Sequence, residues 1–299
     1  MNQVIENLLI HPNTSGQLEA FYNHPANALL ITGRPGSGKA AIAHHLTARL
    51  LDVTPDKLLS HPQFMLIEKP VDKSEIPIDS IRQLISKTSL RVPTRQAGEG
   101  SINRVALLED AGLMSTEAQN ALLKLLEEPP AGTLLILTAD STDSLLPTIV
   151  SRVQTIRIIP PSLEQSVEYF KEHHQPAVAS AWELSQGGPG LLSALLSQQD
   201  SHPLKAGVAD AKTFLGMPPY QRIITLQELS KDKARFSGFL EALARVLSAL
   251  HAQSIRSNRQ KNAADLLTAR QAVEEALTQN KLNANQRLTY LALVLNIPL

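Results

Sequence analysis

The residue types best suited to chemistry lie in one glycine-rich stretch near the N-terminus. The stretch ends on a lysine and an alanine and reads Gly33-Arg34-Pro35-Gly36-Ser37-Gly38-Lys39-Ala40. An apolar run, residues 28–32, precedes it, and a helix-like run, residues 41–50, follows it. Between a strand and a helix, glycines let backbone N–H groups turn toward a phosphate, and the helix N-terminus adds partial positive charge. The pattern therefore predicts a phosphate-binding loop, with Lys39 reaching the β- and γ-phosphates of a nucleotide.

The last position of this loop departs from the usual pattern. G-x-x-x-x-G-K-[ST] ends in a hydroxyl residue that binds Mg²⁺, and Ala40 stands there in this chain. The loop would then bind ATP or ADP weakly, or be only a vestigial nucleotide site, and we expect hydrolysis at this loop to be poor or absent. Two alternatives stay open, a coincidental glycine turn and a true loop that no longer binds nucleotide.

A pair of acidic residues follows a second apolar run. Glu109 and Asp110 come directly after residues 104–108, about 70 residues beyond the loop. A phosphate-loop enzyme needs a carboxylate at the end of a neighbouring strand to hold Mg²⁺ through water, and usually a second to polarise the attacking water. The pair is placed for these roles, and the alternative is a strand-end pair that merely caps a turn.

These residues need a sheet that brings the strand ends together. Most of the expected strands are continuous apolar runs separated by helical stretches, which is typical of a parallel sheet covered on both faces. Five strands are expected, at residues 28–32, 64–68, 104–108, 133–138 and 153–159. The pattern predicts helices between them, among them residues 116–128 and 144–150.

The rest of the chain is expected to be helical. We divide it at the double proline 160–161 into residues 1–160, a small helical unit at 161–204 and an all-α remainder at 205–299. Several apolar residues of this remainder fall on one helical stripe, which we expect to be core rather than a binding face: Phe239, Leu243, Val246, Leu247 and Leu250.

Composition restricts the function classes. The 299 residues include no cysteine, which excludes disulfides and cysteine zinc sites. We see no membrane-spanning run and no signal peptide, and expect a cytoplasmic protein. Residues 201–299 carry 13 Lys and Arg against 7 Asp and Glu, a net charge of +6, and residues 1–200 carry −6. The basic part could meet an acidic partner or nucleic acid, or simply have solvated helix faces.

Two segments resemble a known family. Residues 110–130 contain the stretch Ala118-Gln119-Asn120-Ala121-Leu122-Leu123-Lys124-Leu125-Leu126-Glu127-Glu128-Pro129-Pro130. This closely resembles the clamp-loader branch of the AAA+ family, in which such a helix follows the Walker B strand. Residues 148–153 resemble the Ser-Arg-Cys motif of that branch, with Val153 in place of cysteine. The resemblance covers residues 15–200 by motif.

The resemblance implies an α/β P-loop AAA+ domain, a small helical lid and a C-terminal collar for oligomerisation. It also implies a subunit with a degraded site. Glu109-Asp110 stands where the hydrolysing subunits read Asp-Glu, and residues 187–192 lack the expected sensor 2 arginine. Many family members hold zinc in cysteines after the loop helix, and we expect no zinc and no other metal site here.

The resemblance gives Arg152 its expected role. It matches an arginine finger that acts in trans on the ATP of a neighbouring subunit, and the alternative is a surface arginine that pairs with a carboxylate. The implied function is that of a non-hydrolysing subunit of the DNA polymerase III clamp loader. The implied partners are motor subunits, a delta subunit, the sliding clamp and primer-template DNA. The alternatives are an active clamp-loader ATPase of the gamma/tau type, supported by Lys39, and an AAA+ scaffold that acts outside replication.

Overall fold

The chain folds into two compact units. The computed structural model describes residues 8–89, 102–197, 203–281 and 286–297. The units are Met1–Ser162 and Leu163–Leu299. The finer division into residues 1–160, 161–204 and 205–299 stays a prediction.

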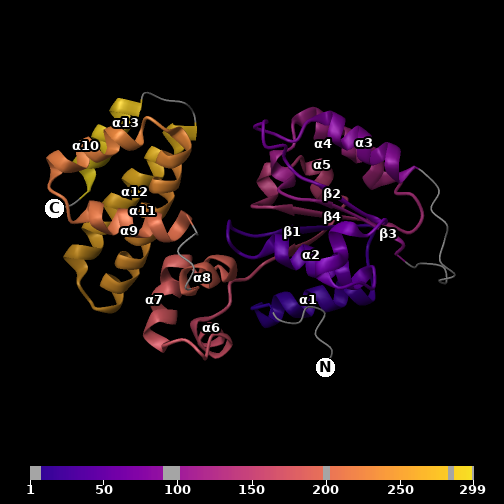
Figure 1. The fold of residues 1–299 in the computed structure, drawn as a ribbon, viewed down its shortest axis with the longest axis horizontal. Coiled ribbons are helices and arrows are strands. Elements are labelled where there is room, and N and C mark those ends of the chain that lie inside the picture. The colour runs from indigo at the N-terminus through magenta and orange to yellow at the C-terminus, as the bar shows by residue number, and fades with distance from the viewer. Residues whose placement is uncertain (1–7, 90–101, 198–202, 282–285, 298–299) are drawn as a thin grey trace. The chain divides into compact units, whose positions relative to one another are not determined.

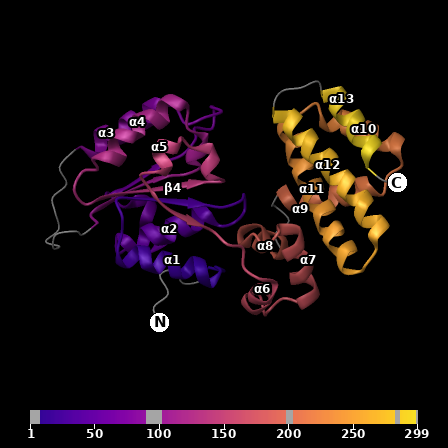
Figure 2. The same ribbon diagram turned by 180° about the vertical axis from the view of Figure 1, so that it is seen from behind.

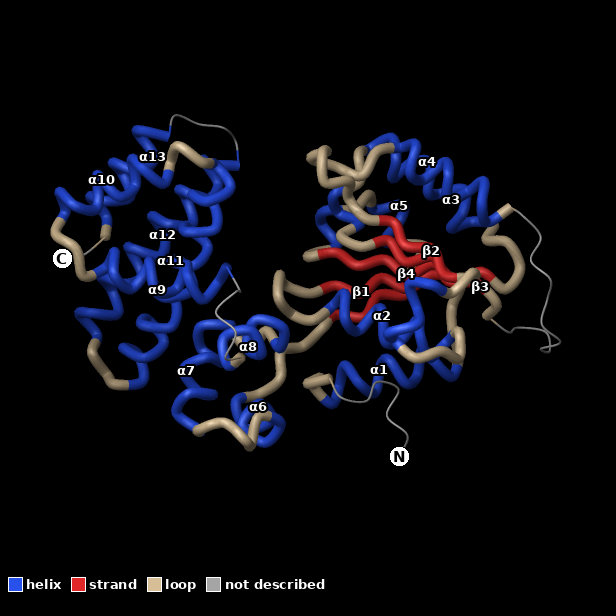
Figure 3. Tube along the Cα trace, viewed as in Figure 1, coloured by secondary structure: helices blue, strands red, loops and turns tan. Residues whose placement is uncertain are grey.

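The first unit is built on a five-stranded sheet in which all neighbouring strands are parallel (Figure 3). The order is β2-β3-β4-β1-β5, and the strands are β1 (Ala28–Thr32), β2 (Phe64–Ile67), β3 (Arg104–Leu108), β4 (Thr133–Ala139) and β5 (Gln154–Arg157). The predicted five-stranded parallel sheet is therefore confirmed. The edge strand β5 is shorter than expected and buries only Ile156.

Helices cover both faces of this sheet (Figures 1 and 2). One face carries α1 (Pro12–Asn23) and α2 (Lys39–Leu50), and the other carries α3 (Ile78–Thr88) and α4 (Thr116–Glu127). Successive strand residues alternate between the two cores because side chains along a strand point to opposite faces. Leu29 and Ile31 of β1 thus pack with α1 and α2, whereas its other apolar residues pack with α3 and α4.

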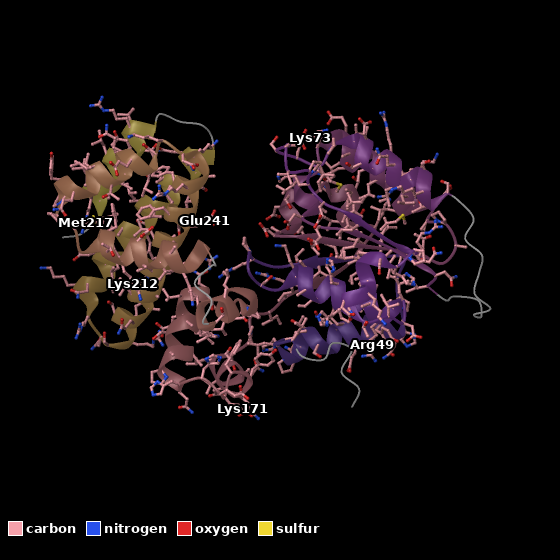
Figure 4. All side chains as sticks on the ribbon, viewed as in Figure 1. Arg49, Lys73, Lys171, Lys212, Met217 and Glu241 are labelled. Carbon is pink, nitrogen blue, oxygen red and sulfur yellow. The ribbon has the colours of Figure 1, made fainter. Side chains whose placement is uncertain are left out.

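The two helices on the first of these faces also contact each other through polar side chains. The guanidinium of Arg49, which is labelled in Figure 4, lies 4.5 Å from the ring centroid of Tyr22. A cation over an aromatic face is attracted by the ring quadrupole. This contact joins α2 to α1 at the end of α2 remote from the glycine-rich loop.

The segment after β4 is less regular than the sequence predicts. The expected helix 144–150 is a 3₁₀ turn, η3 (Thr142–Ser144), followed by a short helix, α5 (Pro147–Val150). Leu146 is extended, with ψ 138°, because the ring of a following proline disfavours the α conformation. Likewise, the connection after α2 contains a 3₁₀ helix, η1 (Pro55–Ser60), and a further 3₁₀ turn, η2 (Ala111–Leu113), follows β3.

The second unit consists of helices in the part that the structure describes. They are α6 (Leu163–Tyr169), α7 (Gln175–Ser185), α8 (Pro189–Leu196), α9 (Pro203–Leu215), α10 (Pro219–Leu229), α11 (Lys233–Arg256), α12 (Gln260–Lys281) and α13 (Gln286–Asn296). The longest helix, α11, packs against α9 and α12. The predicted stripe on α11 is buried from Phe239 to Leu247. The prediction was wrong for Leu250, which is 37% exposed.

One buried arginine joins α9, α10 and the segment after α13 in this unit. Arg222 of α10 is 1% exposed. Its guanidinium donates hydrogen bonds to the carbonyls of Phe214 (3.3 Å), Leu215 (2.7 Å) and Ile297 (3.2 Å). Burial lowers the pKa of Arg222. The side chain therefore satisfies the carbonyls at the end of α9 and the carbonyl that follows α13.

Candidate functional site

The glycine-rich loop lies at the carboxyl end of β1 and leads directly into α2. Gly36 and Gly38 have φ angles of 81° and 85°, in the left-handed region that glycine adopts without strain. Gly33 donates its N–H to the carbonyl of Ala139 at 3.1 Å, and a Cβ on Gly33 would lie 2.5 Å from Oγ of Ser37. The backbone path therefore favours glycine at 36 and 38, and a side chain at Gly33 would have to displace that of Ser37. The shape of the loop fits a phosphate cradle.

Lys39, the first residue of α2, is held by two carboxylates. Its Nζ lies 2.8 Å from Oδ1 of Asp140 and 3.4 Å from Oδ1 of Asp110. Only 12% of the Lys39 side chain is exposed. Asp110 follows β3 and Asp140 follows β4, so the carboxyl ends of β3, β4 and β1, which are neighbours in the sheet, meet at this point. The positive charge of Lys39, which is predicted to bind phosphate, is thus already neutralised by two carboxylates of the same chain.

A pocket of about 300 Å³ opens beside Lys39. Its lining comes from the loop, from the segment after β3 and from the segment after β4: Pro35, Lys39, Asp110, Gly112, Leu113, Asp140 and Ser144. This volume is at the lower end of the range for small-molecule pockets. Ser37 in the loop is buried, and its Oγ has no hydrogen-bond partner in the described part of the chain.

The groups predicted to bind Mg²⁺ are only partly suited to it. Ala40 offers no oxygen from its side chain. Oε1 of Glu109 lies 2.6 Å from Nε2 of His44 on α2, and the His44 ring packs edge-on against Phe64 with centroids 6.0 Å apart. The loop therefore fits the phosphates of a nucleotide, whereas the ligand set for the metal ion is incomplete.

No group of three or more His, Asp or Glu side chains that could hold a metal ion occurs within residues 8–89, 102–197, 203–281 and 286–297. Residues 51–61, which follow the loop helix α2, contain η1 and no cysteine. Within the same ranges, every helix is too short or too polar to cross a membrane.

Arg152 lies just after α5 and is anchored on two sides. Its Nε and Nη2 lie 3.1 Å and 2.9 Å from Oε1 of Glu127 at the end of α4. Its Nη1 donates to the carbonyl of Thr148 at 3.0 Å and to Oγ of Ser151 at 3.2 Å. The Arg152 side chain is nevertheless 38% exposed. The contact with Glu127 is the surface pairing named as the alternative, and the finger role stays a prediction because it needs a neighbouring subunit.

Two residues of the site were not singled out from the sequence as partners. Asp140 follows β4 as Glu109 and Asp110 follow β3, and in a parallel sheet these ends lie at one edge. That rule could have placed Asp140 beside the loop. No signal in the sequence indicates that His44 contacts Glu109.

The two adjacent histidines of α2 have different surroundings. His44 contacts Glu109, whereas burial lowers the pKa of His45 and the neighbouring His44 lowers it further. Adjacent residues on a helix do not share a face. The two side chains therefore do not form a paired metal site.

Comparison with known proteins assigns a family to the first unit. The sequence model of the family described as "DNA polymerase III, delta subunit" matches residues 13–162. The DNA polymerase III subunit delta' of Pseudomonas aeruginosa is 35% identical over 182 residues, which are 55% of this chain and 54% of that protein. The subunit delta' of Escherichia coli is 31% identical over 186 residues, 56% of this chain and 54% of that protein. The matches thus span about half the length of these curated relatives.

A solved structure is similar over a longer part of the chain. It is a DNA polymerase III gamma subunit-related protein from Thermotoga maritima, with a TM-score of 0.50 and 18% sequence identity. The likeness covers 93% of this chain and 97% of that one. At this identity it supports the α/β fold with a helical C-terminal part, and nothing finer.

Proposed function

Because this chain belongs to the DNA polymerase III, delta subunit family, we propose that it is a delta-prime-like subunit of a clamp loader. The family match spans the phosphate loop, Glu109-Asp110 and Arg152. In this role the chain acts in DNA replication, assembled with ATP-hydrolysing motor subunits and a delta subunit. The assembly places the sliding clamp on primer-template DNA.

The chain itself hydrolyses ATP poorly or not at all. The observation that carries this part of the proposal is that Lys39 is already paired with Asp140 and Asp110 while Ala40 supplies no metal ligand. A bound Mg²⁺ ion would neutralise phosphate charge and orient the attacking water. With Glu109 engaged by His44, the described residues leave that ion short of ligands. The loop retains the backbone shape to hold phosphates weakly.

Arg152 contributes to a reaction at a neighbouring subunit. An arginine presented to the phosphates of another subunit's nucleotide stabilises negative charge as it develops. Two features of Arg152 support this role. Its side chain is exposed, and Thr148, Ser151 and Glu127 hold it in one orientation, which reduces the entropy lost when it meets a phosphate.

The helical second unit serves assembly. Residues 205–299 act as a collar that joins the other subunits, and residues 161–204 act as a small lid. The support for these roles is that the described residues of both parts form helices. The net charge of +6 over residues 201–299 would also favour binding to an acidic partner or to nucleic acid.

The test is reconstitution of the complex. This chain is mixed with motor subunits, the delta subunit and the clamp of the same organism, and ATP hydrolysis stimulated by DNA and clamp is followed. Arg152→Ala should assemble normally and lose most of the stimulated hydrolysis, whereas Arg157→Ala, an exposed arginine on β5, should match wild type. Normal hydrolysis by the Arg152→Ala complex would remove the finger role. A chain that does not assemble at all would remove the clamp-loader assignment.

An active ATPase subunit of the gamma/tau type is the second candidate. The pocket of about 300 Å³ beside Lys39 favours it, because the lysine retains the position from which β- and γ-phosphates are bound. Turnover by the isolated chain, abolished by Lys39→Ala, would establish this candidate. Absence of turnover by the isolated chain leaves the first proposal in place.

A further inference from the structure

The contact between Lys39 and Asp140 is of the kind that a bound phosphate would make. Nζ of Lys39 and Oδ1 of Asp140 are 2.8 Å apart, the usual distance of a charge-assisted hydrogen bond. Lys39 reaches toward the pocket that the loop and the segments after β3 and β4 line, and Asp140 is part of the same lining. The carboxylate of Asp140 therefore occupies the position beside the Lys39 ammonium group that a phosphate oxygen would take.

Asp140 is fixed in this place by regular structure. It directly follows β4, whose last residue, Ala139, accepts the N–H of Gly33 at the start of the loop. On its other side, Oγ of Ser141 accepts the N–H of Asp143 in the 3₁₀ turn η3. Strand and turn thus hold the backbone of Asp140 from both ends.

The second carboxylate is fixed as well. Asp110 has left-handed backbone angles, φ 47° and ψ 50°, and its N–H donates to Oγ1 of Thr138 on β4 at 2.9 Å. Two carboxylates and one ammonium group therefore line the pocket, an excess of one negative charge. A nucleoside diphosphate or triphosphate that enters must break the pair at Lys39 and then meet both carboxylates.

We propose that Asp140 is the residue that excludes polyphosphate ligands from this loop, by occupying Lys39 in their place. This inference rests on the proposed function, in which the loop is a poor nucleotide site, and it names the side chain responsible. Asp140 acts as an internal anion that closes an otherwise well-formed cradle. Removing its charge frees Lys39 for a phosphate and removes one repulsive group from the pocket.

The test is nucleotide binding by the isolated full chain. Fluorescence anisotropy with labelled ADP and ATP compares wild type with Asp140→Asn and Asp143→Asn. Asp143 is an acidic neighbour in the same segment that is absent from the pocket lining, and it serves as the matched control. Its Oδ2 accepts a hydrogen bond from Oγ of Ser141 at 2.8 Å, and the amide oxygen of asparagine keeps an acceptor there. We expect Asp140→Asn to bind ADP and ATP about tenfold more tightly than wild type, and Asp143→Asn to match wild type. Labelled AMP should bind all three chains equally, because Lys39 meets the β- and γ-phosphates.

Several results would overturn the proposal. Equal affinity of Asp140→Asn and wild type for ADP would do so, as would an equal gain for Asp143→Asn or for AMP. The gain must also disappear in the double variant Asp140→Asn, Lys39→Ala. Asp140→Ser is the second variant if the asparagine chain shows altered thermal unfolding.

The outcome is separate from the fate of the proposed function. Assembly and the effect of Arg152→Ala on the reconstituted complex are measured without reference to nucleotide at this loop. If Asp140→Asn binds ADP no more tightly than wild type while Arg152→Ala still abolishes stimulated hydrolysis, only the proposed role of Asp140 is refuted. Failure of assembly removes the clamp-loader proposal and leaves the binding result standing.

Discussion

Replacing Glu127 by Gln removes the negative charge beside Arg152 and keeps the shape of the side chain. Oε1 of Glu127 lies 3.1 Å from Nε and 2.9 Å from Nη2 of the arginine. Nη1 has its own acceptors, the carbonyl of Thr148 at 3.0 Å and Oγ of Ser151 at 3.2 Å. The substitution therefore loosens one edge of the guanidinium and leaves another anchored.

The expected size of the effect follows from exposure. The Arg152 and Glu127 side chains are 38% and 52% exposed, so solvent screens the pair and its contribution is about 0.2–1 kcal/mol. The melting temperature should fall by no more than about 4 °C. An energy of 1 kcal/mol corresponds to about a fivefold change in an equilibrium constant. Loss of an arginine finger itself costs about a thousandfold or more in related phosphoryl-transfer systems.

The assay is DNA- and clamp-stimulated ATP hydrolysis by the reconstituted complex. We expect Glu127→Gln to lower the rate about twofold to fivefold, because the arginine is less well oriented. Glu128→Gln, at the adjacent exposed carboxylate, is the matched control and should match wild type. A rate above wild type would refute the reasoning, since Glu127 would then compete with the phosphate for Arg152. A loss as large as that of Arg152→Ala would also refute it.

Two further changes test the fold around the site. Arg222→Ala leaves three carbonyls without their buried donor and should lower the free energy of unfolding of the second unit by about 3 kcal/mol. Thermal unfolding would report this as a fall of about 10 °C, and exposed Arg235→Ala is the control. Burial lowers the pKa of His45 in the folded chain. Between the folded pKa and the ordinary imidazole pKa, the unfolded chain therefore binds more protons than the folded chain. The free energy of unfolding should fall as the pH drops through the ordinary imidazole pKa toward the folded pKa. Urea unfolding from about pH 7.5 to about pH 5.5 should show a shallower fall for His45→Gln than for wild type, and equal slopes would contradict the assignment.

The sheet and α4 could be predicted because their signals are local. β1 and β3 have the predicted bounds, since four of the five residues in each are apolar and the sheet buries all five. α4 begins where Oγ of Ser115 accepts the N–H of Ala118 at 3.2 Å, and it ends at Glu127, shortly before two prolines. Each boundary depends on residues within a few positions of it.

The site could be predicted only in part because its contacts are long-range. Lys39 and Asp140 are 101 residues apart in sequence, and His44 and Glu109 are 65 apart. The motif identified the lysine and the acidic pair. Which carboxylate forms an ion pair with the lysine depends on strand order and on the left-handed backbone of Asp110. Neither property can be obtained from spacing along the chain.

The pairing at Lys39 changes how its substitution should be interpreted. In an open phosphate loop, Lys39→Ala removes a ligand for phosphate and little else. Here it would also leave Asp110 and Asp140 beside one another without their shared cation, and two like charges at close range destabilise a fold or raise a carboxyl pKa. A defect of Lys39→Ala in assembly is therefore not evidence that nucleotide binding matters. Restoration of assembly by Lys39→Ala combined with Asp140→Asn would assign that defect to repulsion, whereas a double variant as defective as Lys39→Ala would assign it to the lysine.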